Sequence, residues 1–332
     1  MPTIIDIAKK AGVSFKTVSR VLNEEVNVRP ATRQKVLDAA KVLNYRTNTA
    51  ARNLRSKRPK VIALLINNPS QSYTQSVQLG ALLGCQKYGL FLSLHTKYDK
   101  KTIVSLASNT ETIGFILTPP ISDNKKVLET LSNLRKPFVR LGTKHPKAGG
   151  TRICIDDRQA SYKITEHLIN LGHNQIGFIK GHADYETATH RLLGYQEALE
   201  ANGLSTNNGL IVQGDFSYAS GLVSTEKLLG LNEKPTAIFA SNDEMAAGAL
   251  AAAYKKGMRV PDSLSIVGFD DSPIATAVYP QLTTVRQSLS NMIEKAVEIL
   301  VKPQTNNNNN NKIVILDHAL VLRDSTGPAL DT

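Results

Sequence analysis

Residues 4–23 read IIDIAKKAGVSFKTVSRVLN, and this stretch decides the fold of the N-terminal part of the chain. Thr3, with an acidic residue three positions later, is typical of a helix N-cap. Gly12 is suited to end that first helix. Ser14 is suited to cap a second helix over 15–22. The spacing therefore predicts two short helices joined by a tight, glycine-containing turn.

A third helix is predicted from Pro30, a residue suited to the first helical position, through Leu43. Two helices around a tight turn, supported by a third, form the helix-turn-helix arrangement of many DNA-binding proteins. We therefore expect a small all-α domain over residues 1–46. Residues 47–60 contain few large apolar side chains and are expected to be a linker with a short helix that is marginal alone.

The positive charge of the chain is concentrated at its N-terminal end. The first 60 residues contain 14 Lys and Arg but only 4 Asp and Glu, which accounts for ten of the net twelve positive charges. A solvated surface could also carry such charge, but an excess this large on a short segment favours binding to a polyanion such as nucleic acid.

The second helix presents two different faces on a helical wheel. Val18, Val21 and Leu22 share an apolar arc that is expected to pack on the other helices. Phe15, Lys16, Ser19 and Arg20 occupy another arc, which is expected to face outward. Arginine can form paired hydrogen bonds with guanine in the major groove, and lysine can reach a guanine acceptor or a phosphate. An ordinary amphipathic surface helix is the alternative interpretation.

From residue 61 the pattern changes to short β-rich runs that alternate with helical stretches. The expected strands begin near residues 61, 90, 113, 137, 153, 175, 236 and 264, and the expected helices lie near 74–88, 124–135, 159–171, 190–202, 217–230, 243–257 and 288–302. This alternation predicts parallel sheets covered by helices on both faces.

About 270 residues exceed one comfortable sheet, so we expect two doubly wound parallel-sheet subdomains within 61–332. The N-subdomain is expected to comprise about 61–156 and 286–316, and the C-subdomain about 157–285 and 317–332. Ligands of such folds bind where the carboxyl ends of the strands meet, so a cleft between the two sheets is the expected site. The six asparagines of 306–311 are expected to form a solvated loop.

Several classes of protein are disfavoured by what the sequence lacks. The two cysteines, Cys85 and Cys154, lie in apolar runs without metal-ligand spacing, so buried thiols and no metal site are expected. No signal peptide and no membrane-spanning stretch is seen, which favours a cytoplasmic protein over an exported solute-binding protein. The common motifs of nucleotide-binding, metalloprotease and serine-hydrolase sites are missing, so no enzyme activity and no cofactor is expected.

His173 is expected to form a structural hydrogen bond, and His145, His182 and His190 to be isolated polar groups.

Longer motifs along the whole chain resemble those of LacI/GalR-family repressors. After the opening stretch come VRPATRQKVLDAAKVLNYRTN, AARNLRS, LGHNQIGFIKG, HRLLGYQEAL, ASNDEMAAGAL, RVPDSLSIVGFDDSPIA, PQLTTVRQ and LRDST, in the family's order. The resemblance implies that the domain over 61–332 has the fold of periplasmic sugar-binding proteins. It also implies a homodimer on a near-palindromic operator in double-stranded DNA.

The resemblance assigns DNA contacts to three parts of the N-terminal region. Phe15, Lys16 and Arg20 match the family's recognition helix, and 48–56 matches a hinge helix that folds in the minor groove beside its partner. Leu54 matches the leucine that wedges into the central base step. Thr47 departs from the family, which often has proline there. The full expected set is Thr3, Ser14, Phe15, Lys16, Thr17, Arg20, Asn23, Arg29, Tyr45, Asn48, Ala51 and Leu54.

The resemblance also implies an effector between the two subdomains. The matching positions are Asn68, Tyr73, Thr118, Asp157 or Gln159, Arg191, Phe216, Asn242 and Asp270. Carboxylate, amide and guanidinium groups suit neighbouring hydroxyls, and Phe216 suits stacking on a sugar ring or a base.

Structural roles remain open for several of these residues. Asp270 could cap a turn together with Asp271, Arg191 could pair with a surface carboxylate, and Asn242 could cap the following helix. We favour the ligand role for Arg191, Asn242 and Asp270, because they recur at strand or loop ends that should face one cleft.

The sequence therefore predicts a repressor of carbohydrate uptake or catabolism genes that is controlled by a sugar or glycoside. A purine or nucleoside effector is the second possibility, and an activator or a corepressor-dependent repressor is another. Release of DNA by the effector is the commoner logic in the family. A dimer is mildly favoured over a tetramer, because no leucine-heptad tail follows the last strand.

Overall fold

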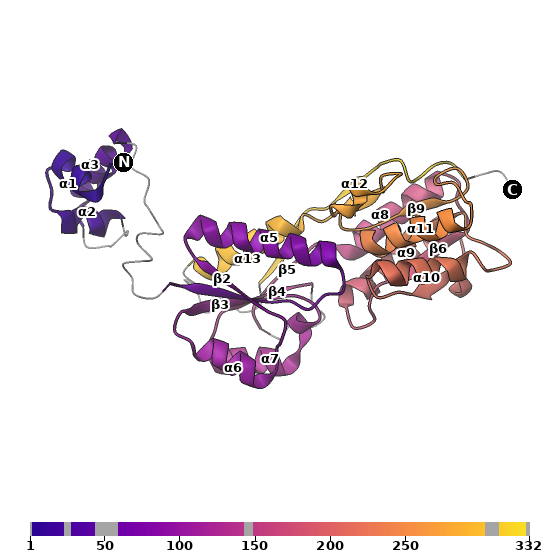
Figure 1. Ribbon diagram of the computed structural model, residues 1–332, viewed down its shortest axis with the longest axis horizontal. Helices are drawn as coiled ribbons and strands as arrows, with labels where there is room; N and C mark the ends of the chain where they lie inside the picture. Colours follow the sequence, from indigo (N-terminus) through magenta and orange to yellow (C-terminus); the bar gives the residue numbers. More distant parts are fainter. Residues whose placement is uncertain (1, 23–27, 44–58, 143–148, 303–311, 330–332) are drawn as a thin grey trace. The chain divides into compact units, whose positions relative to one another are not determined.

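The structure is a computed structural model that describes residues 2–22, 28–43, 59–142, 149–302 and 312–329. Its contacts divide the chain into two compact units, Met1–Arg58 and Pro59–Thr332. Figure 1 shows the helices and strands of each unit.

The N-terminal unit contains three helices, α1 (Ile4–Ala11), α2 (Phe15–Leu22) and α3 (Pro30–Val42). Their bounds confirm the predicted helix-turn-helix. The Thr3 hydroxyl accepts a hydrogen bond from the Asp6 backbone, and the Asp6 side chain accepts one from the Thr3 backbone, which forms a complete capping box. Gly12 ends α1 in the left-handed conformation, with φ of 63°, which costs least for glycine.

The core of this unit is small and aliphatic. Ile7, Val18 and Val36 are fully buried where the three helices meet, and they represent α1, α2 and α3 respectively. Val18 and Val21 thus confirm the predicted inner face of α2, while Leu22 is only half-buried.

The second unit begins with a six-stranded, wholly parallel sheet, which with its helices we call the N-lobe. Its strand order is β11-β5-β4-β3-β1-β2. The strands are β1 (Val61–Leu65), β2 (Phe91–His95), β3 (Thr112–Leu117), β4 (Phe138–Leu141), β5 (Thr151–Cys154) and β11 (Ile313–Ile315).

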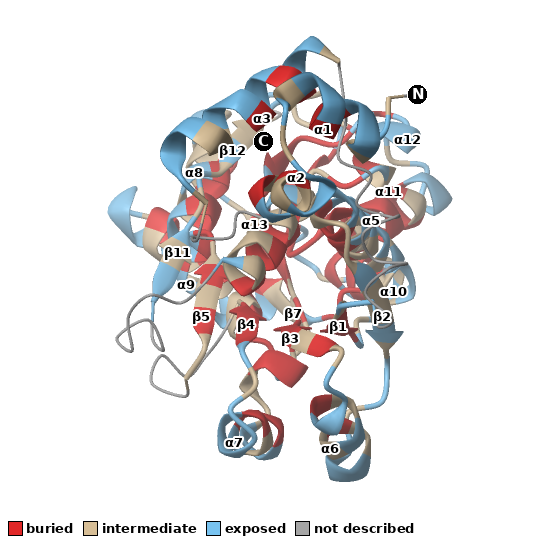
Figure 2. Cartoon of the chain, turned by 90° about the vertical axis from the view of Figure 1, so that its left-hand side faces the viewer, coloured by how far each residue is buried: buried red, intermediate tan, exposed pale blue. Residues whose placement is uncertain are grey.

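Helices cover both faces of this sheet, as the alternation along β1 requires. Ile62 and Leu64 pack with α5 (Gln71–Tyr88) and α13 (Leu289–Val301). Ala63 and Leu65 point to the other face, where α6 (Lys100–Ser108) and α7 (Lys125–Asn133) lie. Figure 1 shows the two helix pairs on opposite sides of the sheet. Figure 2 shows buried residues in β4 and β5, whereas the outer faces of α6 and α7 are exposed.

A second parallel sheet, ordered β7-β6-β8-β9, forms the C-lobe with its helices. Its strands are β6 (Ile176–Lys180), β7 (Ile211–Gln213), β8 (Ala237–Ala240) and β9 (Ser265–Val267). Phe178 faces α8 (Asp157–Asn170) and α9 (Glu186–Ala201), where it packs on Tyr195. Ile179 points to the opposite face, which α10 (Tyr218–Leu228) and α11 (Asp243–Lys255) cover.

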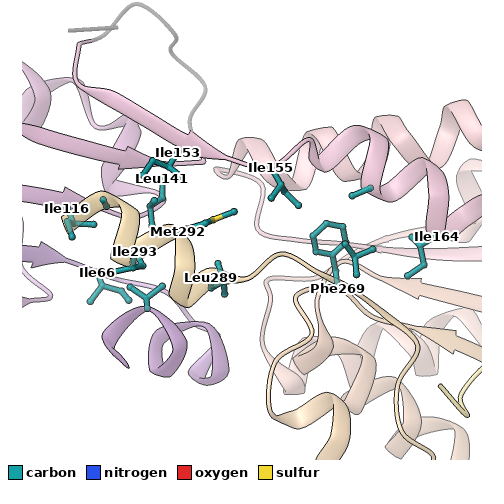
Figure 3. Packing of buried hydrophobic residues seen from close by; sticks show 14 of the residues in the cluster. Ile66, Ile116, Leu141, Ile153, Ile155, Ile164, Phe269, Leu289, Met292 and Ile293 are labelled. Carbon is teal, nitrogen blue, oxygen red and sulfur yellow. The ribbon is translucent and has the colours of Figure 1, made fainter. Parts of the chain in front are cut away.

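The chain crosses between the lobes after β5, after β10 (Thr284–Arg286) and between β11 and β12 (Ala319–Val321). β10 and β12 form a small antiparallel sheet. Apolar side chains fill the space beside these crossings. Figure 3 shows Ile155 and Leu289 between the N-lobe core around Ile153 and the C-lobe residue Phe269. The subdomain boundaries predicted above remain a proposal, which the strand membership of the two sheets supports.

The structure also contains elements that the sequence pattern did not predict. These are α6, α12 (Ile274–Ala277), the short strands β7, β10 and β12, and the 3₁₀ turns Ile121–Asp123 and Asn208–Leu210. Most have three or four residues, too few for a periodic pattern to develop. The asparagine tract 306–311 lies outside the described residues.

Helices α10 and α11 pack so closely that their glycines cannot be enlarged. A Cβ atom on Gly248 would lie 2.2 Å from the Tyr218 carbonyl oxygen and 2.7 Å from the Leu222 nitrogen. We therefore expect Gly248→Ala to lower the free energy of unfolding by about 1–3 kcal/mol, because backbone must move to make room. Urea unfolding measures this change. Gly230→Ala is the control, because its new Cβ would meet nothing closer than 3.3 Å. Equal stability of the two variants would contradict the packing described.

Candidate functional site

Helix α2 presents polar and aromatic side chains to solvent on the face opposite its core residues. Phe15 is 48 % exposed, and Lys16 and Arg20 are exposed as well. The Ser14 hydroxyl accepts a hydrogen bond from the Thr17 nitrogen at 3.2 Å, so Ser14 caps α2 as predicted. The face expected to meet base edges is therefore accessible.

The remaining residues expected to contact DNA are partly described. Thr3 caps α1, and Arg29 is exposed immediately before α3. Asn23, Tyr45, Asn48, Ala51 and Leu54 lie outside the described residues, as does Thr47. The DNA contacts of the whole set remain a prediction.

A cavity of about 50 Å³ lies between the N-lobe and the C-lobe. Seven of the predicted effector residues line it: Asn68, Tyr73, Asp157, Arg191, Phe216, Asn242 and Asp270. Ligand pockets usually measure about 300–1,000 Å³, so a sugar ring can enter only if the lobes or these side chains move.

Arg191 is the centre of the polar part of this cavity. Its Nε donates to Asp157 Oδ1 at 2.9 Å, and its Nη1 lies 3.6 Å from Asp270 Oδ1. The guanidinium stacks on the Phe269 ring, with 3.6 Å from Cζ to the ring centroid. All three charged side chains are at least nine-tenths buried. The surface ion pair considered as an alternative for Arg191 is therefore wrong, because both of its carboxylate partners are buried.

Aromatic side chains form another wall of the cavity. Phe216 has a positive φ of 74°, and its ring lies where a Cβ atom on Gly181 would be, only 2.0 Å from the ring. Tyr185 packs on Phe216 with a centroid distance of 5.4 Å. The absence of a side chain at Gly181 thus leaves room for the tip of the Phe216 ring beside the end of β6.

Asn242 lines the cavity, but its polar atoms serve the protein itself. Its Oδ1 accepts from the Met245 nitrogen at 3.0 Å, and its Nδ2 donates to the Phe216 carbonyl oxygen at 2.9 Å. The capping role given above as the alternative for Asn242 is therefore present. The same side chain also fixes the segment that carries Phe216.

Two of the predicted effector positions do not line the cavity. Thr118 is fully buried, and its hydroxyl donates to the Leu65 carbonyl oxygen at 3.1 Å. Gln159 is exposed in the first turn of α8, where its nitrogen donates to Asp156. Of the alternatives Asp157 and Gln159, Asp157 is the one that faces the cavity.

The adjacent residues Asp270 and Asp271 connect the cavity to the crossings. Both have positive φ, 113° and 52°. Asp270 accepts a hydrogen bond from the Gln287 side chain, which lies on the crossing after β10. Asp271 pairs with Arg286 Nε at 2.6 Å and with Arg323 Nη2 at 2.5 Å.

These environments shift the two pKa values in opposite directions. Burial raises the pKa of Asp270 above its ordinary value, and Arg191 and Gln287 only partly oppose this. Burial would also raise the pKa of Asp271, but the hydrogen bonds from Arg323 and Arg286 outweigh it and lower that pKa.

The sequence interpretation missed Tyr185, Thr187 and Gln287, which also line the cavity. Tyr185 and Thr187 follow the carboxyl end of β6, and Gln287 follows β10. The rule that ligand sites gather at the carboxyl ends of parallel strands could have indicated the first two. Gln287 follows a three-residue strand that the pattern did not reveal.

His173, His182 and His190 have structural or surface positions. His173 is buried and bonds Thr236 and Ser265 through its two ring nitrogens, which confirms its predicted role. His182 and His190 lie near acidic residues at the surface, and His145 lies outside the described residues. Within the described ranges, no group of His, Cys, Asp and Glu could hold a metal ion, and no helix is long and apolar enough to span a membrane.

Comparison with known proteins agrees with this architecture. Residues 3–48 match the family described as bacterial regulatory proteins, lacI family, and residues 165–326 match a periplasmic binding protein-like domain. Catabolite control protein A of Priestia megaterium is 34 % identical over 329 residues, covering 98 % of this chain and 99 % of that protein. The chain belongs to the lacI family. It is therefore a DNA-binding transcription regulator, and its relatives are transcription regulators rather than members of an enzyme family.

Solved structures of lacI-family regulators cover the whole architecture. A complex of the transcriptional regulator CelR with cellobiose has a TM-score of 0.73 at 29 % identity and covers 98 % of this chain and all of that one. The lac repressor dimer bound to operator and the anti-inducer ONPF has a TM-score of 0.72 at 27 % identity, with 98 % of this chain and 99 % of that chain covered. These likenesses confirm the predicted helix-turn-helix and periplasmic-binding-protein-like fold.

The opposite pKa shifts of Asp270 and Asp271 predict opposite effects of pH on stability. The raised pKa of Asp270 contributes stability that is fully present below the ordinary value of 3.8 and is lost as pH rises through the raised value. The lowered pKa of Asp271 contributes stability that is present above 3.8 and is lost as pH falls through the lowered value. Urea unfolding of wild type, Asp270→Asn and Asp271→Asn between pH 3 and pH 7 tests both signs.

We expect the difference in the free energy of unfolding between wild type and Asp270→Asn to shrink as pH rises, because asparagine cannot ionise. The difference in the free energy of unfolding between wild type and Asp271→Asn should grow as pH rises over the lower part of the same range. The second variant is thus a matched control one residue away. Parallel curves for the two variants would show that these carboxyls do not have the environments described.

The exposure of this face of α2 predicts that a substitution there weakens DNA binding and leaves the rest of the protein unchanged. Arg20→Ala should weaken operator binding by about 1–3 kcal/mol, the usual cost of losing a bidentate base contact. Fluorescence anisotropy with an operator duplex measures this at fixed salt. Arg259→Ala, which removes an exposed arginine of the C-lobe, should leave the affinity unchanged. Undiminished operator binding by Arg20→Ala would remove this residue from the recognition surface.

Proposed function

We propose that this lacI-family regulator represses carbohydrate uptake or catabolism genes and is controlled by a sugar or glycoside bound between the lobes. The observation that carries the proposal is the buried cluster of Asp157, Arg191 and Asp270 on the wall of the interlobe cavity. Carboxylates accept hydrogen bonds from neighbouring hydroxyls, and the guanidinium donates to ring or hydroxyl oxygens. The cellobiose complex of CelR supports the same ligand class.

The charge of the cluster favours an uncharged ligand. Among the described residues that line the cavity, two carboxylates, Asp157 and Asp270, face one cation, Arg191. A phosphate or carboxylate on the ligand would add negative charge to a buried site that already has a surplus, and burying such a charge is costly. Hydroxyl groups carry no such cost, and their hydrogen bonds reject analogues that lack them.

A purine or nucleoside is the second candidate for the effector. Phe216 and Tyr185 lie side by side at the cavity wall, and stacked aromatic rings suit a planar base. The carboxylates could accept hydrogen bonds from the base N–H groups. An activator or corepressor mechanism would use the same site.

On DNA, we propose that two copies place their α2 helices in successive major grooves of a near-palindrome. The segment 48–56, outside the described residues, would supply the minor-groove wedge through Leu54. A face for pairing the sensor domains is available on α5, where Leu79, Leu82 and Leu83 are exposed. Effector binding would shift the population between two arrangements of the lobes and release the operator.

A ligand screen tests the effector class. Thermal unfolding of the full chain should be shifted upward by a neutral sugar or glycoside, with cellobiose, ribose, adenosine and glucose 6-phosphate as the probes that separate the classes. The ligand that shifts the protein should also change operator affinity. Asp270→Ala should keep operator binding but lose this response.

The outcomes separate the possibilities. A shift by adenosine alone would favour the purine or nucleoside effector, and a shift by glucose 6-phosphate alone would contradict the charge argument. If Asp270→Ala responds to the ligand like wild type, Asp270 does not belong to the site.

A further inference from the structure

Glu244 forms a contact across the cleft that does not belong to the ligand cluster. It lies in α11 of the C-lobe, and its Oε1 accepts two hydrogen bonds from Ser72 in α5 of the N-lobe. The Ser72 nitrogen donates at 3.0 Å and the Ser72 hydroxyl at 2.7 Å. Both residues are half-buried, so the contact is partly shielded from water.

The carboxylate lies between the N-terminal ends of two helices. Ser72 is the second residue of α5, and Glu244 is the second residue of α11. The N-terminus of a helix carries a partial positive charge because its first N–H groups have no partner within the helix. Two such ends that approach each other repel, and a negative charge between them stabilises both.

The first turn of α5 is capped by residues from both lobes. Within the N-lobe, the Ser70 hydroxyl accepts from the Tyr73 nitrogen at 3.2 Å, and Asn68 Oδ1 accepts from the Ser70 nitrogen at 2.9 Å. The acceptor for the Ser72 nitrogen comes from the C-lobe. Separation of the lobes therefore removes one partner from this turn and leaves the others in place.

A second hydrogen bond across the mouth of the cleft, also between described residues, is weaker. The Tyr185 hydroxyl donates to the Asn67 carbonyl oxygen at 3.3 Å. That bond joins two neutral groups, whereas hydrogen bonds to an ionised partner are shorter and about twice as strong. Glu244 thus makes the stronger polar contact between the lobes at this edge.

We propose that Glu244 is a positioning residue for the cleft, a latch that holds the lobes together by capping α5 across the gap. It acts without touching the effector and sets how often the lobes separate to admit one. The narrow cavity described above agrees with lobes that are held together. The order of the first turn of α5 then depends on closure of the cleft, because the acceptor for the Ser72 nitrogen comes from the other lobe. The same helix carries the exposed leucines at 79, 82 and 83.

The latch can be tested without knowing the effector, in the full chain. Hydrogen exchange resolved to the Ser72 amide reports the hydrogen bond, and double electron–electron resonance between labels at Lys101 and Glu200, both exposed and on different lobes, reports their separation. Labelled subunits are diluted with unlabelled ones so that only distances within one chain are measured.

Glu244→Ala should speed exchange of the Ser72 amide about tenfold, the factor of roughly 1.4 kcal/mol expected for a lost hydrogen bond to a charged group. It should also move the lobe distances to longer values. Glu244→Gln keeps an acceptor oxygen and loses the charge, so it should give a smaller change in the same direction.

Glu226→Ala is the matched control, because Glu226 is also a C-lobe carboxylate, bonded to Lys255 at 2.7 Å within its own lobe. It should change neither readout. Thermal unfolding confirms that each variant is folded. If the Ser72 amide exchanges as in wild type in folded Glu244→Ala, or if the lobe distances stay the same while exchange rises, the latch is overturned.

Discussion

The burial of one guanidinium is the constraint on which the sensor domain depends. Arg191 is removed from water, so its charge must be balanced and its donors satisfied by the protein. Asp157, the first residue of α8 directly after the crossing that follows β5, and Asp270, from the loop after β9, supply that balance. Because these carboxylates come from different parts of the chain, the ion pairs fix the crossing and the loop at one point of the cleft. Gln287 then ties the same cluster to the crossing after β10.

Much of this architecture could be predicted from the sequence, because it depends on local patterns. The caps at Thr3 and Ser14, the turn at Gly12 and the alternation of apolar runs gave the helix-turn-helix and the two parallel sheets. Strand β7 was not predicted, because a strand of three residues is too short to show an alternating pattern of apolar and polar residues. Helix α6 (Lys100–Ser108) was also not predicted, although Asp99 caps it. A half-exposed helix of nine residues shows only a weak apolar stripe.

The site was harder to predict, because a polar residue at a strand end can face the cleft or complete the backbone. Thr118 follows β3 as expected, but its hydroxyl turns back to the Leu65 carbonyl oxygen. Asn242 does both, since it caps α11 and also borders the cavity. The spacing in the sequence predicts the end of the sheet at which such a residue lies. It does not predict the direction of the side chain, because that depends on unpaired backbone groups that form only in the folded chain.

The polarity of parallel sheets explains why acidic residues gather in the cleft. Helices that follow parallel strands begin at the carboxyl ends of those strands, which is also where the cleft lies. The N-termini of α5, α8 and α11 therefore carry partial positive charge close to the site, near Ser72, Asp157 and Glu244. Carboxylates placed there stabilise these helix ends, and Arg191 balances the surplus at the centre. This balance of charge is the physical basis of our proposal that a neutral sugar binds in the cleft, because hydroxyl groups would leave the arrangement intact, whereas an anion would compete with the carboxylates for Arg191.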